Sequence, residues 1–171
     1  NTGIHGLRDV KKTSSPSIDI QISSNFERLL FDITDDAKYV REQMLKLNSD
    51  HQYELSNQIV KKMRDVFSSY SVSQDEVKEI IHNFYNNYNI VIDPHTAIGL
   101  GSANKSEDEF DIKVSLATAH PAKFSDTVSE IIGSDDFIPP KVKTMMELDD
   151  NYFILENNAI MVKEFLEDKI K

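Results

Sequence analysis

The sequence predicts an α/β fold in which a partial parallel sheet is flanked by helices, with a helical insertion. Two observations carry this prediction. Between residues 66 and 132, short apolar segments alternate with amphipathic helical segments, which is the order typical of a parallel sheet with helical crossovers. Nearer the start of the chain, three helical segments follow one another without a strand between them. We therefore assign residues 35–64 to the insertion and residues 1–34 and 65–171 to the α/β part.

The composition predicts a soluble globular protein. Of the 171 residues, 39% are hydrophobic and 28% are charged, and the net charge is −10. An acidic chain argues against nucleic acid or an anionic membrane as the main partner, because phosphate groups attract basic surfaces. No apolar run approaches the roughly 20 residues that span a bilayer. There is no Cys, so disulfides are excluded and a cytoplasmic location is expected.

Six segments have the composition or alternation of strands. They are residues 10–13, 18–22, 66–72, 90–92, 111–117 and 152–155, the last of which is either a strand or an extended link. The segment 111–117 has the clearest pattern, because Ile112, Val114 and Leu116 occupy every second position, which predicts a buried strand. Residues 1–7 have no periodic pattern and are expected to form a loop. Several of these strands would lie at a sheet edge if the chain stood alone, which is natural for a piece of a larger sheet.

Capping residues mark the starts of the predicted helices. Ser24 with Glu27 forms one capping box, and Ser73 with Glu76 forms another. Gly133 is a typical residue to end a helix. Further helix starts are expected at Asp35 or Asp36, near Tyr53, at Asp93 followed by Pro94, at Pro121, at Pro139–Pro140, and at Asn157 or Asn158.

Two predicted strand-to-helix corners each carry a His and a Thr. They lie at the carboxyl edge of the predicted sheet, where ligands bind in open α/β folds. The first corner holds Asp93, His95 and Thr96, and the second holds Thr118, His120 and Lys123. Spacing alone leaves two interpretations open. Asp93 can be only a helix cap and Thr118 a hydroxyl bonded to the backbone, or these groups can face a ligand.

Other chemistries have weaker support in the sequence. A metal site made of Asp93, His95, His120 and His82 lacks the spacing of known zinc sites. Glycine-rich phosphate loops of the Walker or Rossmann type do not occur, and neither does the Gly-x-Ser-x-Gly nucleophile motif. Residue spacing therefore predicts a candidate ligand edge without assigning a reaction to it.

Three motifs resemble those of the threonine synthase family, in the same order and over almost the whole chain. They are SPSIDI with SSNFER (residues 15–28), DPHTA (residues 93–97) and LATAHPAKF (residues 116–124). The resemblance implies a pyridoxal phosphate (PLP) enzyme of the tryptophan-synthase-like fold. Such enzymes convert O-phosphohomoserine and water into threonine and phosphate.

The resemblance also implies that part of the enzyme is missing. In this family the lysine that forms the Schiff base with PLP, and the glycine-rich loop that holds its phosphate, belong to the amino-terminal region, and neither motif occurs here. Residues 1–171 therefore resemble the carboxyl-terminal portion, which is expected to be inactive alone. The implied partners are O-phosphohomoserine and the amino-terminal region, and association through an exposed sheet edge is a further expectation. A non-catalytic α/β binding or interaction module is the alternative.

The resemblance assigns a role to Thr118, as the hydroxyl partner of the pyridine nitrogen of PLP. A neutral hydroxyl leaves that nitrogen largely unprotonated, unlike a carboxylate partner. Ser24, Asn25 and Arg28 lie at a predicted helix start, which suits a phosphate or carboxylate. The residues implied to line the active site are His120, Lys123, Asp93, His95, Thr96, Ser24, Asn25 and Arg28.

Overall fold

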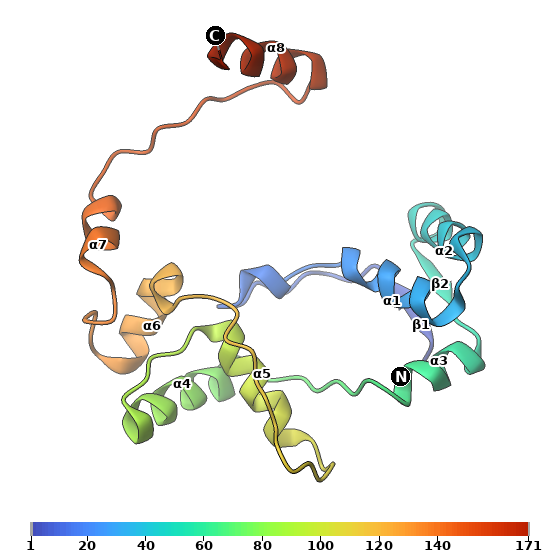
Figure 1. The fold of residues 1–171 in the computed structure, drawn as a ribbon, viewed down its shortest axis with the longest axis horizontal. Helices are drawn as coiled ribbons and strands as arrows, with labels where there is room; N and C mark the ends of the chain where they lie inside the picture. The colour runs from blue at the N-terminus through green and yellow to red at the C-terminus, as the bar shows by residue number, and fades with distance from the viewer. Residues whose placement is uncertain (1, 171) are drawn as a thin grey trace. The chain divides into compact units, whose positions relative to one another are not determined.

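The computed structural model describes residues 2–170 and contains two compact units, Asn1–Ile138 and Pro139–Lys171. Both units are mainly helical (Figure 1). In chain order the elements are β1 (Ile4–Gly6), η1 (Pro16–Ile18), α1 (Ser24–Thr34), α2 (Ala37–Asp50), β2 (Gln52–Glu54), α3 (Asn57–Arg64), α4 (Gln74–Tyr88), α5 (Pro94–Lys105), η2 (Pro121–Phe124), α6 (Ser125–Ile132), α7 (Pro140–Met146) and α8 (Ala159–Ile170), where η denotes a 3₁₀ helix.

The predicted parallel sheet is absent from residues 2–170. Their only sheet is the antiparallel pair of β1 and β2, in which Ile4 lies opposite Glu54. None of the six predicted strand segments forms a strand, and residue 18 lies in η1 instead. Alternation correctly identifies segments that have an apolar side. A strand also needs a neighbouring strand that pairs with its N–H and C=O groups. None of these segments pairs with a neighbouring strand within the described chain.

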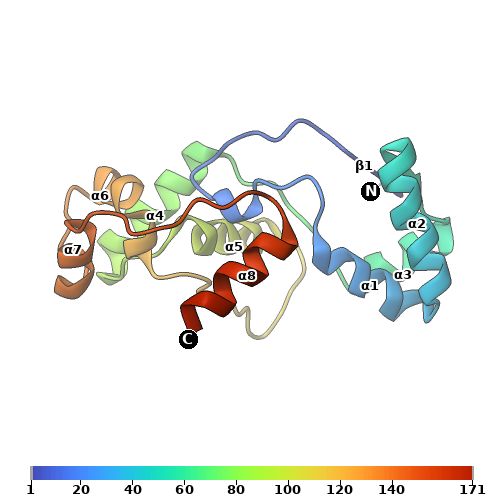
Figure 2. The same ribbon diagram turned by 90° about the horizontal axis from the view of Figure 1, so that it is seen from above.

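The first hydrophobic core joins β1 and β2 to α1, α2 and α3 (Figure 2). Its buried members are Leu30, Leu47, Tyr53 and Leu55. The imidazole of His5 on β1 stacks on Phe26 of α1, with 5.2 Å between ring centroids. Residues 4–6, expected to lie in a loop, therefore form a strand that covers this core; Asn1 lies outside the described residues.

Helix caps in this part confirm one prediction and contradict another. Asp36 caps α2, and its carboxylate accepts a hydrogen bond from the Tyr39 N–H at 2.9 Å. The capping box predicted at Ser24 and Glu27 is wrong, because the helix begins one residue earlier than the motif requires. Ser23 is the N-cap residue of α1 and makes no side-chain capping bond.

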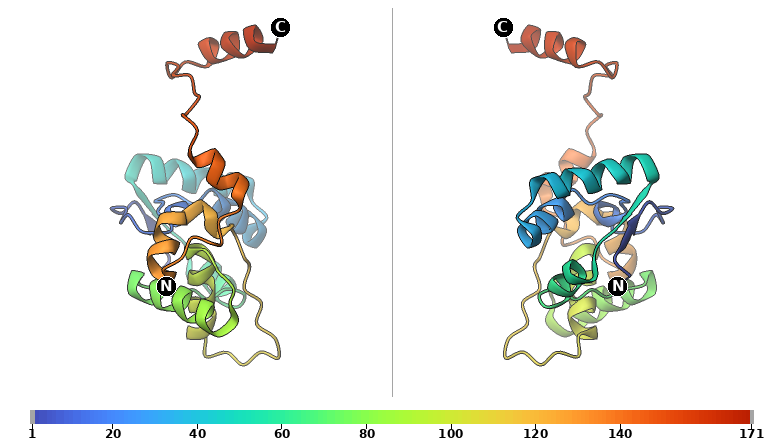
Figure 3. Two further views of the ribbon diagram at one scale, coloured as in Figure 1. Left: turned by 90° about the vertical axis from the view of Figure 1, so that its left-hand side faces the viewer. Right: turned by 90° about the vertical axis from the view of Figure 1, so that its right-hand side faces the viewer.

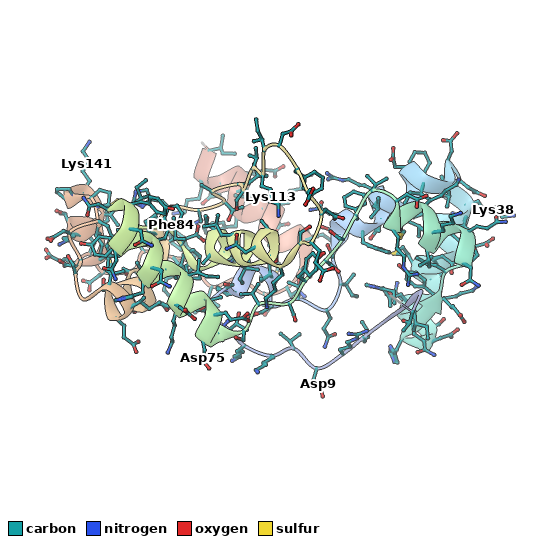
Figure 4. All side chains as sticks on the ribbon, turned by 90° about the horizontal axis from the view of Figure 1, so that it is seen from below. Asp9, Lys38, Asp75, Phe84, Lys113 and Lys141 are labelled. Atoms are coloured by element: carbon teal, nitrogen blue, oxygen red, sulfur yellow. The ribbon has the colours of Figure 1, made fainter. Side chains whose placement is uncertain are left out.

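The second core is formed by α4, α5 and α6. Val77 and Ile81 of α4 pack with Ile92 and Ala97, and partly buried residues of α6 complete the cluster. Phe84 of α4, which is labelled in Figure 4, also contacts this core. The capping box of Ser73 and Glu76 is confirmed, with both of its reciprocal hydrogen bonds present.

Glu76 makes a second contact that produces a pH prediction. Its carboxylate accepts a hydrogen bond from the Lys105 ammonium at 2.7 Å and from the Ser73 N–H at 2.7 Å, and these bonds lower its pKa to about 2. The folded-state pKa of Glu76 lies below the ordinary 4.5. The ionised carboxylate therefore stabilises the folded state fully above about pH 5, and this stabilisation is lost as the pH falls toward 2.

We expect the protection factors of amides in the first turn of α4, which are corrected for the intrinsic effect of pH on exchange, to fall between pH 5 and pH 2. A Glu76→Gln variant should show this lower protection already at pH 7, and little further loss on acidification. The effect is small because the pair is exposed. Equal protection in both proteins at pH 7 would remove the ion pair from this role.

An extended segment, residues 107–117, runs beside α5 after that helix ends. The Lys113 ammonium donates to the carbonyls of Ala103 and Ser106 at 3.2 Å, and Figure 4 shows this side chain over α5. Farther along, Ser115 lies so close to Gly99 that a methyl group on Gly99 would come within 3.0 Å of the Ser115 hydroxyl. The polar side of the segment therefore faces the helix.

The other side of the same segment is apolar and faces solvent. Its four large side chains are between 62% and 80% exposed: Phe110, Ile112, Val114 and Leu116. No main-chain to main-chain hydrogen bond joins residues 107–117 to other described residues. Figure 3 shows the segment as a loop that leaves the helices and returns. The prediction of a buried strand at 111–117 is therefore wrong for this chain: the segment is not a strand, and its apolar side chains are not buried.

The second unit contains α7 and α8. The Phe153 and Phe165 rings lie 5.0 Å apart, and the Lys169 ammonium lies 4.7 Å above the Phe153 ring. The Asn158 side chain accepts a hydrogen bond from the Ile160 N–H at 2.9 Å, as predicted for the start of the terminal helix. No helix among residues 2–170 is long and apolar enough to cross a membrane.

Candidate functional site

The candidate site is built around Asp93, the N-cap residue of α5. Its carboxylate accepts a hydrogen bond from the His95 N–H at 2.9 Å, and Pro94 occupies the first helical position. This confirms the predicted cap. The Asp93 side chain is completely buried, however, whereas helix caps are commonly exposed. A buried carboxylate needs a partner for each oxygen, and Asp93 has them.

Both carboxylate oxygens of Asp93 are engaged by residues of its own helix. One oxygen lies 3.0 Å from Nδ1 of His95, in addition to the bond from the His95 main chain. The other accepts a hydrogen bond from the Thr96 hydroxyl, which is itself buried. Asp93, His95 and Thr96 therefore form one hydrogen-bonded cluster, and we call it the Asp93 cluster.

Two segments remote in sequence attach to the Asp93 cluster. The Thr96 hydroxyl accepts a hydrogen bond from the Thr118 N–H at 3.2 Å. The Nε2 atom of His95 accepts one from the Ser17 N–H at 3.3 Å, and Ser17 lies within the short helix η1. The His95 ring also contacts Phe124 of η2, with 4.8 Å between centroids.

The structure thus brings the two predicted corners together. Thr118 lies next to Thr96, although its main chain rather than its hydroxyl makes the contact. Ser17 and Phe124 belong to the same site and were not among the candidate residues. Both lie inside the quoted motifs, but nothing in those motifs indicates that they contact His95.

The outward-facing side of the site carries Thr118, His120 and Lys123, whose side chains are exposed. His120 is the N-cap residue of η2, and its Nδ1 atom accepts a hydrogen bond from the Ala122 N–H at 3.1 Å. The Thr118 hydroxyl makes no hydrogen bond to the rest of the described chain. A hydroxyl, an imidazole and an ammonium are therefore available to a ligand here.

The remaining candidates lie elsewhere. Ser24, Asn25 and Arg28 are exposed on α1, which packs against α2 and α3 rather than α5. His82, from the metal interpretation, lies on α4 and contacts Asn86 at 2.8 Å. In the part of the chain that the structure describes, no group of three or more His, Asp or Glu side chains is placed to hold a metal ion.

Comparisons with known proteins agree on one family. A family model described as threonine synthase, C-terminal, matches residues 96–166. A curated threonine synthase from Pseudomonas aeruginosa is 34% identical over 155 residues, which cover 89% of this chain and 33% of that protein. This chain spans about a third of the length of the curated relatives it matches.

Solved structures give the same result at the level of the fold. A PLP-bound threonine synthase from Brucella melitensis superposes with a TM-score of 0.84 at 35% identity, over 98% of this chain and 36% of that one. The yeast threonine synthase gives 0.82 at 29% identity, over 99% and 38%. The backbone fold of this chain is therefore similar to part of these longer threonine synthases.

Proposed function

Since this chain belongs to the threonine synthase family, we propose that it forms the carboxyl-terminal part of an enzyme that converts O-phosphohomoserine and water into threonine and phosphate with PLP. The chain alone is inactive in this proposal, because the cofactor-binding lysine and phosphate loop that the family resemblance implies have no counterpart in its sequence. The absence of Cys fits a cytoplasmic enzyme.

The observation that carries the proposal is the position of Thr118. Its main-chain N–H is held by the buried Thr96 hydroxyl, while its own hydroxyl is exposed and makes no bond within the described chain. Because the main chain of Thr118 is fixed and its neutral hydroxyl is free, this hydroxyl is suited to hydrogen-bond the pyridine nitrogen of PLP. When bound, PLP supplies an electron sink for the substrate, and a hydroxyl partner tunes that sink.

We assign two neighbouring side chains, the imidazole of His120 and the ammonium of Lys123, to phosphate binding. His120 and Lys123 lie within five residues of Thr118, and both are exposed. Their donors suit the phosphate of the cofactor or of O-phosphohomoserine. Ser24, Asn25 and Arg28 lie at the start of α1, where free main-chain amides favour an anion, so we assign them to a phosphate or carboxylate.

We further propose that residues 110–117 form a strand in the complete protein, as part of the parallel sheet of a tryptophan-synthase-like fold. Their main chain has no partner among the described residues, and the apolar side that an additional layer would cover is exposed. Most of the length of the relatives lies outside this chain, and that region would supply the neighbouring strands. The isolated chain is expected to associate through the same edge.

The direct test replaces Thr118 in the full-length protein. We expect Thr118→Ala to weaken PLP binding and to shift the absorption spectrum of the bound cofactor, while Thr118→Ser keeps the hydroxyl and stays close to the original spectrum. An unchanged spectrum together with unchanged turnover in Thr118→Ala would remove Thr118 from this role.

A second experiment tests the incompleteness of the site. The chain of residues 1–171 is mixed with PLP and treated with borohydride, and bound pyridoxal is located by mass spectrometry. We expect only low, scattered labelling of lysines. Stoichiometric labelling of one lysine would show that the chain carries its own cofactor site and would contradict the proposal.

A further inference from the structure

We propose that Asp93, His95 and Thr96 are positioning residues rather than ligand-binding ones, and that they act as two separate arms. The Thr96 arm fixes the main chain of Thr118, and the His95 arm fixes the main chain at Ser17. The inference deepens the proposed function, because the importance of the Thr96 arm for the cofactor rests on the role proposed for Thr118.

The first step is that Asp93 has little capacity left for a ligand. Its side chain is fully buried, one oxygen faces two nitrogen atoms of His95, and the other accepts the Thr96 hydroxyl hydrogen. A buried carboxylate with this set of donors is satisfied inside the protein. Its function is therefore to hold the two side chains that follow it.

The second step is that these bonds give the Thr96 hydroxyl a fixed direction. A hydroxyl donates one hydrogen bond and accepts others. Because its hydrogen points to Asp93, its lone pairs face outward, where the Thr118 N–H donates at 3.2 Å. Asp93 thus orients the acceptor that positions Thr118, although it does not touch Thr118.

The third step is the same argument for His95. Its Nε2 atom accepts from the Ser17 N–H and must therefore carry no hydrogen. A neutral imidazole then carries its hydrogen on Nδ1, which lies 3.0 Å from the Asp93 carboxylate. With both ring nitrogens engaged and the ring against Phe124, His95 has no nitrogen free for acid-base chemistry on a substrate.

The test uses hydrogen exchange at two amides of the full-length protein. Thr96→Val keeps the shape of the side chain but removes the hydroxyl, and it should accelerate exchange at Thr118 by about tenfold, as expected for the loss of one hydrogen bond, with little change at Ser17. Thr96→Ser should restore protection. His95→Phe should give the reverse pattern, with faster exchange at Ser17 and little change at Thr118.

Controls separate a positioning role from general loosening of the fold. His82→Phe, on exposed α4 surface, makes the same chemical change as His95→Phe and should alter neither amide. Two results would overturn the proposal: unchanged exchange at Thr118 in Thr96→Val, or equal acceleration at both amides in either variant. The second result would mean that the cluster is only a general support.

A spectroscopic measurement links the Thr96 arm to the cofactor. Thr96→Val should shift the absorption of bound PLP in the same direction as Thr118→Ala, and Thr96→Ser should not. A cluster with no positioning role would lower the amount of bound PLP without changing its spectrum. If Thr118→Ala leaves the spectrum unchanged, the proposed function of Thr118 fails, while the exchange results still decide whether the two arms exist.

Discussion

An Asp93→Ala variant is expected to lose about 3 to 5 kcal/mol of stability in the region around α5. The substitution leaves buried donors of His95 and Thr96 without an acceptor, and each such donor costs about 1 to 3 kcal/mol. Loss of the helix cap adds about 1 kcal/mol. The free energy of local opening, measured by native-state hydrogen exchange of α5 amides, gives the result directly.

Two controls make the Asp93 result specific. Asp93→Asn keeps one carbonyl oxygen for the His95 N–H and should cost clearly less than Ala. Asp36→Ala removes the cap of α2, which is also an aspartate but is exposed, and should cost only about 1 kcal/mol. If Asp93→Ala costs no more than Asp36→Ala, Asp93 is an ordinary cap and the buried cluster contributes nothing further.

A Leu47→Ala variant is expected to destabilise the first core by about 2 to 5 kcal/mol. Leu47 is 2% exposed and packs with Leu30, Tyr53 and Leu55, so truncation leaves a cavity that its neighbours cannot fully close. Leu45→Ala on the same helix provides a matched control. Leu45 is 57% exposed, and its truncation should change stability by less than about 0.5 kcal/mol.

The Leu47 measurement also reports on the independence of the two cores. Hydrogen exchange should accelerate in α1, α2 and α3, while Ile81 and its neighbours in the second core keep their protection. Faster exchange of similar size in α4 and α5 would show that the two cores open together. Equal effects of the Leu47 and Leu45 substitutions would contradict the assignment of Leu47 to the first core.

Local chemistry made several helix boundaries predictable, but not that of α3, which begins at Asn57 after β2 rather than near Tyr53. The caps at Asp36, Ser73 and Asp93 and the helix end at Gly133 depend on a few adjacent residues, and the structure confirms all four. The capping box at Ser24 failed because two serines are adjacent there, and Ser23 rather than Ser24 occupies the cap. Such shifts of one residue are not resolved by sequence motifs.

The strands could not be predicted from local chemistry, because alternation describes one segment and a sheet requires two. Ile4–Gly6 pairs with Gln52–Glu54 across nearly 50 residues of chain, and neither segment has a strong pattern. The same limit applies to the site. His95 and Ser17 are 78 positions apart, so sequence spacing gave no indication that one accepts a hydrogen bond from the other.

The extended segment 107–117 has a consequence for how the chain behaves in solution. Open N–H and C=O groups beside a row of large apolar side chains form a template for aggregation. A charge within such a row usually protects it, but the exposed carboxylates of this segment (Glu107, Asp108, Glu109 and Asp111) all precede Ile112. Lys113 is bonded to the carbonyls of Ala103 and Ser106 on the opposite side. Val114→Lys would place a charge within the exposed row of apolar side chains. We expect this variant of the isolated chain to aggregate less.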